Sequence, residues 1–288
     1  MPTVHPLTDL MIISSPSNPR IKQIRALSQR KTRRETGLFF VEGIRPVAEA
    51  VALRADIDIL IVAPDLLRSD FGQETVRTAD QVGISSLEVS ETVFQTLSRK
   101  DGPQGLGAVV RQRWETLEAV QPGDELAWVV LEDVQNPGNL GSILRTCDAV
   151  GAAGIILLGD TADPYDPAAV RSSMGAIFSQ RLIRATLDAL ITWKQQHHLT
   201  MIGASDSAEI DYQAMPYGPP ILLSMGSEQH GLSDTHTAAC DDTVRIPMVG
   251  RSDSLNLAVA TSVILYEIFN KWRANEQIRQ SDNHQITK

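Results

Sequence analysis

The chain has 288 residues, of which 42% are apolar and 21% charged, and its formal net charge is −9. This is the composition of a globular protein, and the length favours two domains. The two cysteines, Cys147 and Cys240, lie far apart in the sequence, which argues against a disulfide scaffold and fits a reducing cytosol. Residues 1–10 lack the pattern of a signal peptide, and no apolar run approaches the roughly 20 residues of a membrane span. We therefore expect a cytoplasmic protein without a membrane anchor, and the Cys and His spacings predict no metal site.

Residues 14–113 have the pattern of a small α/β domain. A helix start at Pro16-Ser17-Asn18-Pro19 leads into a basic helix that carries apolar residues at helical spacing. Strands are expected at residues 38–41, 57–62, 84–89 and 106–111, and further helices at residues 44–53, 74–82 and 91–97.

The first helix is basic although the whole chain is acidic. A local group of cations can follow the phosphates of a nucleic acid, because the charge of the rest of the protein is screened beyond about 10 Å. A solvated helix face explains the same pattern equally well. The candidate RNA-binding residues here are Arg20, Lys22, Arg25, Arg30 and Arg33. Arg99 and Lys100 stand beside glycines in a later loop, which suits either phosphate contact or a simple connection between strands.

Residues 114–125 resemble a linker, and residues 126–275 form a second section. Apolar runs predict strands at residues 127–131, 154–158, 200–204, 220–224 and 243–246. Helical patterns lie at residues 140–150, 168–178, 187–197, 234–239 and 255–273. This alternation predicts a parallel sheet with helices on both faces. Residues 276–288 are polar and are expected to form a flexible tail.

Three segments of the second section join glycines or prolines to polar side chains. In the first, residues 136–145, a strand leads into a helix, and Asn139 and Arg145 lie off the apolar stripe of that helix. Such a junction can bind a phosphate or a sugar hydroxyl, because amide groups and the helix dipole favour anions there. An ordinary turn with an exposed arginine is the alternative. The segment lacks G-x-G-x-x-G, which disfavours a dinucleotide-dependent oxidoreductase.

The other two segments also follow strands. In residues 225–233, Gly226 permits close approach to the backbone, and Glu228 stands at the carboxyl edge of a parallel strand, where open α/β sheets bind ligands. A capping turn is the alternative. In residues 246–256, Ser254 can be a helix N-cap, whereas Asn256, expected in the first helical turn, is less easily explained in that way.

Together and in this order, the three segments resemble the SpoU (TrmH) family of RNA ribose 2′-O-methyltransferases. The resemblance extends over residues 126–271 and includes a further family-like stretch at residues 170–178. Residues 14–113 are similar to the small RNA-binding domain, related to a ribosomal protein, that often precedes the catalytic domain. The resemblance implies an α/β protein: a C-terminal SPOUT domain with a parallel sheet and a deep trefoil knot, and a small N-terminal α/β RNA-binding domain.

The resemblance also implies S-adenosylmethionine as cofactor, bound in the knot mainly by backbone groups, and a homodimer with each site lined by both subunits. Arg171 matches a position that reaches RNA phosphate across the dimer in some members. The matching polar active-site residues are Asn139, Arg145, Glu228, Ser254 and Asn256. The cofactor-binding positions are Ser224, Met225, Gly226, Ile246, Met248 and Leu255.

The implied reaction is in-line attack of a ribose 2′-hydroxyl on the sulfonium methyl group, without a metal. The family is often described with the residue matching Arg145 as the base. Because an arginine pKa lies above about 12, we expect Arg145 instead to bind phosphate and stabilise the developing alkoxide, held in place by Glu228 and Asn139. Two positions depart from the family pattern: Ser227 replaces a common asparagine, and residues 100–102 replace a common Thr-Pro.

We therefore expect methylation of structured RNA, ribosomal RNA rather than transfer RNA, because the family's transfer RNA guanosine enzymes usually lack a full N-terminal domain. A transfer RNA ribose methyltransferase and a non-catalytic RNA-binding or ribosome-assembly factor are the alternatives. A self-protection role against an antibiotic also remains open, since resistance methyltransferases share this layout.

Overall fold

The computed structural model describes residues 12–123, 125–218 and 220–286, with only the backbone described for residues 276–286. Residues 1–10, considered above for a signal peptide, lie outside the described residues. Among the described residues, no helix is long and apolar enough to span a membrane, and no group of three or more His, Cys, Asp or Glu side chains could hold a metal ion. The chain forms two compact units. The first contains residues up to Gln112 together with Tyr165–Phe178, and the second contains the remainder.

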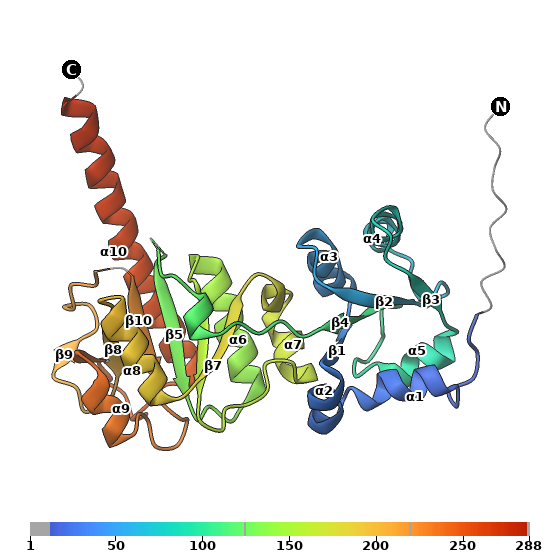
Figure 1. Cartoon of the computed structure of the whole chain (residues 1–288), viewed down its shortest axis with the longest axis horizontal. Helices are drawn as coiled ribbons and strands as arrows, with labels where there is room; N and C mark the ends of the chain where they lie inside the picture. Colours follow the sequence, from blue (N-terminus) through green and yellow to red (C-terminus); the bar gives the residue numbers. More distant parts are fainter. Residues whose placement is uncertain (1–11, 124, 219, 287–288) are drawn as a thin grey trace. The chain divides into compact units, whose positions relative to one another are not determined.

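The described part of the first unit contains a four-stranded sheet in the order β1-β4-β2-β3. Its central pairs are antiparallel, and β3 lies parallel to β2. Helices α1 and α5 cover one face, where Ile21, Phe94 and Val109 belong to one buried cluster. Helices α3 and α4 lie on the opposite side (Figure 1). The elements are β1 (Leu38–Glu42), β2 (Ile57–Val62), β3 (Ser86–Glu88), β4 (Leu106–Arg111), α1 (Pro19–Ala26), α3 (Ile44–Ala52), α4 (Asp70–Gln81) and α5 (Glu91–Leu97).

The basic stretch forms two helices instead of the single expected one. Helix α1 begins after Asn18, whose side chain accepts a hydrogen bond from the backbone N–H of Arg20 at 2.9 Å. The helical conformation is then interrupted, because Gln29 adopts an extended conformation, and the second helix, α2 (Arg30–Thr36), begins after it. Gly37, with a φ of +68°, ends α2. The break turns the two halves of the basic stretch differently, so its cations do not share one face.

Residues Tyr165–Phe178 pack within the first unit although they lie far along the chain. The Tyr165 ring lies 4.6 Å from that of Phe39 on β1, and Asp166 forms an ion pair with Arg33 of α2 at 3.3 Å. The expected uninterrupted second section, residues 126–275, is therefore interrupted by a segment whose buried partners belong to the first unit.

This segment contains α7 (Pro167–Ser173) and the 3-10 turn η2 (Ala176–Phe178) in place of one helix over residues 168–178. The helix ends because Met174 and Gly175 take φ angles of +54° and +105°. A side chain at position 175 would also collide with Glu49, whose Cγ lies 2.8 Å from the place of a Cβ. Close packing against α3 therefore requires the glycine.

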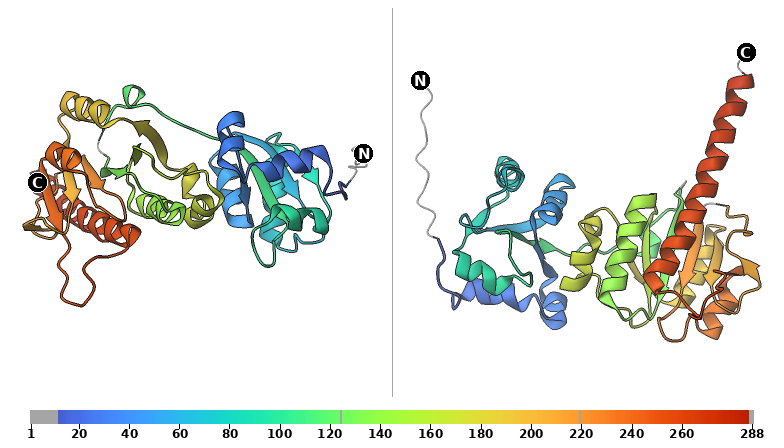
Figure 2. Two further views of the ribbon diagram at one scale, coloured as in Figure 1. Left: turned by 90° about the horizontal axis from the view of Figure 1, so that it is seen from below. Right: turned by 180° about the vertical axis from the view of Figure 1, so that it is seen from behind.

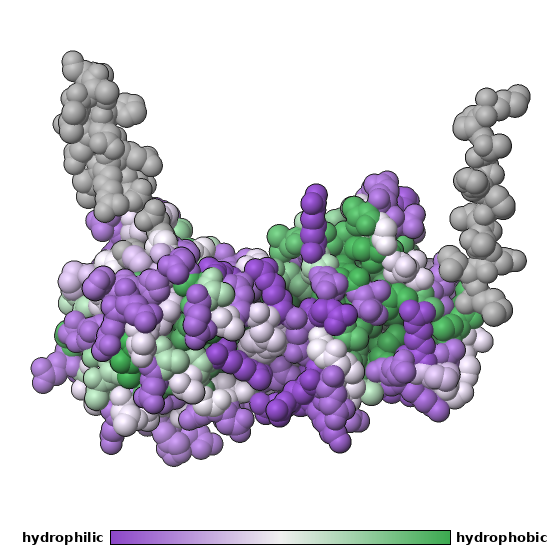
Figure 3. Space-filling model, viewed as in Figure 1, coloured by the Kyte–Doolittle hydropathy of each residue, from purple (hydrophilic) through white to green (hydrophobic). Residues whose placement is uncertain are grey.

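Apolar side chains gather on one surface of the first unit. In Figure 3, apolar residues gather beside α3 and over the strands between α3 and α4. At the ends of these two helices, Leu53, Phe71 and Val82 are 48%, 57% and 63% exposed. This surface lies across the sheet from the basic helix α1.

The described part of the second unit contains a seven-stranded sheet in the order β7-β6-β5-β10-β8-β11-β9, and every neighbouring pair is parallel. The expected parallel sheet is thus confirmed. Two strands were missed: β7 contains only a short apolar core between charged ends, and β9 has two residues. The strands are β5 (Ala127–Glu132), β6 (Gly154–Leu158), β7 (Arg181–Ala185), β8 (Thr200–Ala204), β9 (Ile210–Asp211), β10 (Ile221–Met225) and β11 (Asp242–Arg245).

Helices cover both faces of this sheet. On one face, Trp128 of β5 packs in a buried cluster with Trp193 of α8 (Leu187–Gln196), and η1 (Leu117–Ala119) joins the same cluster. On the other face, α6 (Pro137–Val150) and α10 (Leu257–Ile286) lie side by side (Figure 2), and the hydroxyls of Thr146 and Ser262 are 2.8 Å apart. Helix α9 (Asp234–Ala239) connects β10 to β11.

Helix α10 differs from its expected bounds at both ends. It begins at Leu257 instead of residue 255, and it continues to Ile286, so the expected flexible tail is helical as far as that residue. No glycine or proline follows residue 273, and the sequence therefore contains no strong helix-stopping signal.

The order of the strands predicts where on the sheet a ligand site lies. Strands β6 and β7 extend the sheet to one side of β5, whereas the chain continues from β7 to β8 on the other side, where β10 later fills the place between β5 and β8. The direction in which the chain adds strands to the sheet therefore reverses at the β5–β10 pair. Open α/β sheets bind ligands outside the carboxyl ends of the strands at such a reversal.

Candidate active site

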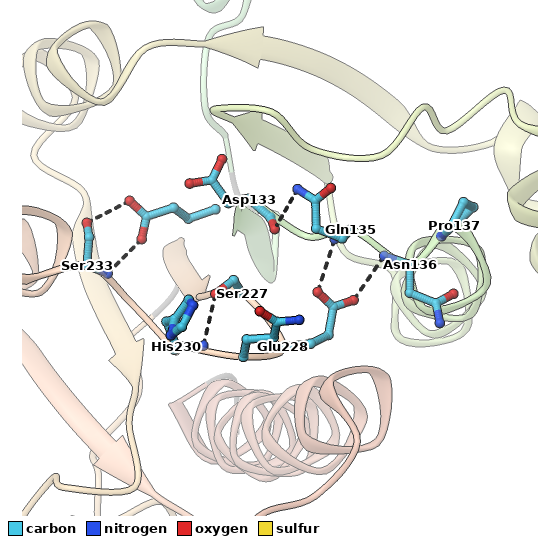
Figure 4. A pocket seen from close by; sticks show the side chains of 11 residues that line it. Asp133, Gln135, Asn136, Pro137, Ser227, Glu228, His230 and Ser233 are labelled. Atoms are coloured by element: carbon cyan, nitrogen blue, oxygen red, sulfur yellow. Dashed lines mark hydrogen bonds between the residues drawn. The ribbon is translucent and has the colours of Figure 1, made fainter.

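A cavity of about 830 Å³ lies at the carboxyl ends of β5 and β10 (Figure 4). Its volume is that of a small-molecule site. One wall is the loop that follows β5, and the other is the loop that follows β10. The lining residues are Glu132, Asp133, Gln135, Asn136, Pro137, Ser227, Glu228, Gln229, His230, Gly231 and Ser233.

The carboxylate of Glu228 joins the two walls. It accepts hydrogen bonds from the backbone N–H groups of Gln135 at 3.0 Å and Asn136 at 3.1 Å, and from the side-chain amide of Asn139 at 3.0 Å. Burial by itself would raise the pKa of Glu228, but the bonds from Gln135, Asn139 and Asn136 outweigh it and hold the pKa below its usual value. Glu228 is therefore ionised at neutral pH and acts as an acceptor.

The wall on the β5 side is fixed by the start of α6. The side chain of Asn136 is the N-cap and accepts from the N–H groups of Gly138 at 2.8 Å and Asn139 at 3.3 Å. Pro137 occupies the first helical position, where its missing N–H costs nothing. Asn139 consequently lies in the first turn of α6, directed at Glu228.

The hydrogen-bond chain continues from Asn139 to Asn256. The Asn256 amide donates to the side-chain oxygen of Asn139 at 3.0 Å, and its own oxygen accepts from Ala258 N at 3.0 Å and Val259 N at 3.4 Å. Asn256 is thus the N-cap of α10, and not a residue of its first turn as expected. Ser254, the expected cap, is exposed two residues earlier, in the loop.

Arg145 does not take part in this series of hydrogen bonds. It is exposed, and among the described residues it forms no side-chain hydrogen bond or ion pair. Six residues separate it from Asn139, which on a helix amounts to about 9 Å along the axis and about 120° around it. The expectation that Glu228 and Asn139 hold Arg145 is therefore wrong for this chain, since α6 turns the two side chains away from each other.

The wall on the β10 side is a tight loop over residues 226–233. Ser227 and Gly231 exchange two backbone hydrogen bonds of 3.0 Å. A Cβ at Gly226 would lie 1.9 Å from the carbonyl carbon of Gly231, so only glycine fits. The carboxylate of Glu132 closes the loop at its far end by accepting from Ser233 N at 2.9 Å and Ser233 Oγ at 2.7 Å (Figure 4).

The residues expected to bind the cofactor do not line the cavity. Ser224 and Met225 are buried in β10, and the Ser224 hydroxyl contacts His236. The Ser224 side chain is therefore directed into the protein and not at the cavity. The others expected here are Gly226, at the end of β10, and Ile246, Met248 and Leu255, between β11 and α10.

The loop between β11 and α10 has the properties of a ligand-binding segment. Met248 and Leu255 are 38% and 37% exposed. Among the described residues, the backbone of residues 247–255 forms none of the turn and loop hydrogen bonds found elsewhere in the chain. This loop therefore offers apolar side chains together with free backbone donors and acceptors.

Several residues of the site were missed by sequence reasoning. Glu132 ends a parallel strand, as Met225 does just before Glu228, so the argument that singled out Glu228 could also have found it. Gln135 and Asn136 act partly through their backbone N–H groups, for which the sequence has no signal. His236 lies in the middle of the short helix α9 and resembles a surface residue until its burial is known.

The cations expected to bind RNA divide into two groups. Arg33 is 1% exposed, and its guanidinium donates to the carbonyls of Leu27 and Ser28, both at 3.0 Å, and to Asp166 at 3.3 Å. It is therefore a structural residue of the first unit and not an RNA contact. Arg20, Lys22, Arg25, Arg30 and Arg171 are exposed.

Within the first unit, four cations surround a cleft of about 90 Å³: Arg25, Arg99, Lys100 and Arg171. One acid, Glu42, also lines the cleft, and its carboxylate accepts from the Ser98 hydroxyl at 2.5 Å and from Arg99 N at 3.2 Å. At about 30 Å³ per water molecule, the cleft has room for about three waters, or for a group of that size.

Comparison with known proteins places these features in a family. The SpoU rRNA Methylase family model matches residues 127–266. A 23S rRNA (uridine(2479)-2′-O)-methyltransferase of Streptomyces viridochromogenes is 33% identical over 258 residues, which are 87% of this chain and 89% of that protein. The chain belongs to the SpoU rRNA methylase family.

Two further SpoU relatives match along most of their length. The 23S rRNA (guanosine(2553)-2′-O)-methyltransferase RlmP of Bacillus subtilis is 27% identical over 89% of this chain and 98% of that protein. The crystal structure of an AdoMet-bound rRNA methyltransferase from Sinorhizobium meliloti superposes with a TM-score of 0.81 at 37% identity, covering 89% of this chain and 96% of that one. Residues 18–108 match the MRM3-like substrate binding domain. The resemblance inferred from the three polar segments is thus confirmed.

Proposed function

We propose that this SpoU protein transfers the methyl group of S-adenosylmethionine to a ribose 2′-hydroxyl of ribosomal RNA. The observation that supports this most directly is the hydrogen-bond chain Glu228–Asn139–Asn256 beside the cavity at the reversal of the sheet. It brings three of the five polar residues that the family resemblance singled out into mutual contact. The two relatives that match nearly end to end are named as 23S rRNA 2′-O-methyltransferases, which favours ribosomal over transfer RNA.

The residues around β10 fit the cofactor. Gly226 leaves the end of the strand without a side chain, and residues 247–255 offer unbonded backbone groups and exposed apolar side chains. Backbone groups of residues 224–226 and of the loop from Ile246 to Leu255 would hold the adenine edge and the ribose. The bound cofactor supplies a methyl group activated by its positively charged sulfur.

The polar chain orients the acceptor nucleotide. Glu228 accepts from three protein donors, so its role is to fix Asn139 and the loop after β5. The Asn139 amide, held at both ends, then presents its remaining hydrogen-bonding capacity to the ribose, and fixed positioning of this kind lowers a barrier by several kcal/mol. Arg145 is exposed and unpaired among the described residues, so its guanidinium is available to bind a phosphate of the RNA. Ser254, exposed in the loop before α10, is also free to contact the nucleotide.

The first unit would bind the substrate RNA. Its cleft of four cations has the size and charge to hold one backbone phosphate, and Arg20, Lys22 and Arg30 are exposed on α1 and α2. Phosphate contacts of this kind fix the register of an RNA without reading its sequence.

A homodimer and a trefoil knot complete the proposal. Val259 and Tyr266 are 48% and 46% exposed on α10, two helical turns apart, and so form an apolar stripe suited to a second copy of the chain. The late insertion of β10 between β5 and β8 supports a threaded C-terminal chain. Sedimentation equilibrium at micromolar concentration tests the dimer: a monomer would contradict it.

The function is tested by transfer of labelled methyl from S-adenosylmethionine to ribosomal RNA, ribosomal subunits and transfer RNA from a strain that lacks the gene, followed by nucleoside analysis. A new 2′-O-methylnucleoside in ribosomal RNA or in subunits is the expected result. Label in transfer RNA would confirm the proposed reaction but would show that the substrate is transfer RNA and not ribosomal RNA. Failure of the folded protein to bind S-adenosylmethionine would leave only an RNA-binding role.

A further inference from the structure

A buried histidine connects the strand and the helix on either side of the loop that carries Glu228. His236 of α9 is 0% exposed, and its Nε2 lies 2.8 Å from the hydroxyl of Ser224 on β10, which is also 0% exposed. Its Nδ1 lies 3.3 Å from Oε2 of Glu132, at the end of β5. Three elements that are distant in the sequence therefore meet at one imidazole.

The neighbours of the ring decide where its proton lies. The Glu132 carboxylate can only accept, so the proton belongs on Nδ1, the ring nitrogen nearer to it, although the 3.3 Å pair lacks hydrogen-bond geometry and is an electrostatic contact. Nε2 is then an acceptor and receives the hydroxyl of Ser224. Burial also lowers the pKa of His236, and the charge of Glu132 offsets that only in part, which agrees with a neutral ring.

The order Ser224, His236, Glu132 resembles the triad of a hydrolase, but no substrate can reach it. Ser224 lies in the central strand of the sheet with no exposed surface, and none of the cavity-lining residues is Ser224 or His236. The arrangement must therefore act on the protein's own structure, and the segment between its ends is the loop of residues 226–233.

That loop is connected to Glu132 directly at its end and through His236 at its beginning. Glu132 accepts two hydrogen bonds from Ser233, where the loop ends, and it faces His236, which in turn contacts Ser224 just before the loop begins. Between these ends the loop has little freedom, because Gly226 is packed against the backbone of Gly231. A shift of α9 relative to β10 would consequently be transmitted to Glu228.

We propose that His236 is a positioning residue of the methyl-transfer site: through Glu132 and Ser224 it fixes the loop of residues 226–233, and with it Glu228 and the cofactor-facing backbone after β10. The inference rests on the proposed function, since the loop matters only if it holds the cofactor and the acceptor nucleotide. His236 itself contacts neither.

Three substitutions separate the two contacts of the ring. His236→Gln keeps a polar group near the place of Nε2 and can still meet Ser224, whereas His236→Asn keeps one near Nδ1 and can still meet Glu132. His236→Leu fills the space with neither contact. Thr237→Ala is the matched control, because Thr237 is the exposed neighbour on the same short helix.

The measurements are the dissociation constant of S-adenosylmethionine by calorimetry and the kcat and KM of methyl transfer, all well below each variant's melting temperature. His236→Leu should weaken cofactor binding and lower kcat about 10- to 100-fold in protein with the circular dichroism of the wild type, as expected for a misplaced site. His236→Gln should recover part of both losses, and Thr237→Ala should lose neither.

Wild-type values for the folded His236→Leu protein would overturn the proposal, and so would equal losses in all three His236 variants. If His236→Leu does not fold, Ser224→Ala removes one partner of the ring with little change in volume and must still weaken cofactor binding. A wild-type protein that binds no S-adenosylmethionine would instead refute the proposed function, so the two failures are distinguishable.

Discussion

The side-chain amide of Asn139 donates to the carboxylate of Glu228 at 3.0 Å, although 89 positions separate the two residues. This bond joins the first turn of α6 to the loop after β10, and it makes two segments that were separate in the sequence into one site. Because Glu228 also accepts from two backbone N–H groups, the same carboxylate shapes the β5 side of the cavity.

Replacing Glu228 tests its role as an acceptor. Glu228→Gln keeps the shape of the side chain but offers one acceptor oxygen where three donors now meet two, so at least one donor loses its partner. We expect methyl transfer to fall about 100-fold, a loss typical of a site displaced by about 1 Å. Asp206→Asn, an exposed acid after β8, is the control and should retain full activity. Unchanged kcat in Glu228→Gln would remove Glu228 from the proposed site.

Asn256 has two separable roles, the cap of α10 and the bond to Asn139. Asn256→Asp keeps the oxygen that caps the helix and loses the amide that donates to Asn139. Its free energy of unfolding should stay within about 0.5 kcal/mol of the wild type, while kcat falls about tenfold or more. Asn256→Ala should lose activity and, in addition, about 1 kcal/mol of stability. Urea denaturation and turnover measured on the same samples check both; equal activity in Asn256→Asp and wild type would contradict the second role.

Arg145 is expected to act in catalysis and not in the fold. Because it is exposed and unpaired among the described residues, Arg145→Ala should change the free energy of unfolding by less than about 0.5 kcal/mol. It should abolish methyl transfer and leave the dissociation constant of S-adenosylmethionine nearly unchanged. Calorimetry and the labelled-methyl assay measure these two effects, and a joint loss of binding and transfer in folded protein would refute this division of roles.

Two arginines of the first unit should respond oppositely to truncation. Arg171→Ala removes an exposed cation of the cleft, and it should weaken RNA binding and reduce the slope of log affinity against log salt by about 1, without lowering the melting temperature. Arg33→Ala removes a buried guanidinium and takes away the donor that serves two carbonyls and Oδ2 of Asp166, whose Oδ1 still caps α7. It should cost a few kcal/mol of stability. Filter binding at several salt concentrations and thermal melts decide; an RNA-affinity loss larger in a folded Arg33→Ala protein than in Arg171→Ala would reverse the assignment.

The buried His236 should make the second unit less stable in mild acid. Burial lowers its pKa in the folded protein below the ordinary histidine value of about 6.5, against the opposing charge of Glu132. The unfolded chain therefore binds more protons between the folded pKa and about 6.5, so stability rises with pH through that window and is lost as pH falls through it. Cys240, whose thiol has its pKa raised to about 12, stays neutral there. Urea unfolding at pH 5 and pH 7.5 should show a smaller difference for His236→Gln than for the wild type; an equal difference would assign the effect to other groups.

The sequence predicted correctly those elements that have a clear local sequence pattern. Strand β2, strand β4 and helix α9 were expected with the bounds that the structure gives them, because continuous apolar runs and capping serines mark them. Helix α7 was expected too long, because the left-handed turn at Met174 has no local signal beyond the following glycine.

The site was predicted in its residue types but not in its connections. Glu228, Asn139 and Asn256 were all singled out, yet Arg145 was expected to join them and does not. That expectation came from the family resemblance, and the rotation of α6 between Asn139 and Arg145 is what contradicts it. Likewise, Arg33 resembles every other cation of the basic stretch, and only the position of Asp166, 133 residues later, makes it a core residue. Contacts over such separations depend on how the sheet is ordered, which no local pattern specifies.

The position of β10 between β5 and β8 has a consequence for synthesis of the protein. A growing chain makes β5 and β8 before β10, so these two strands must leave a place open for it. Asn256 follows β10 in the sequence and can bond to Asn139 only once it has been made as well. An N-terminal fragment that ends before β10 therefore has the wall that follows β5 but lacks the wall that follows β10, and so has no complete site. Activity arises late, in one step with closure of the sheet, and a nascent chain on the ribosome cannot modify RNA until nearly its whole length has emerged.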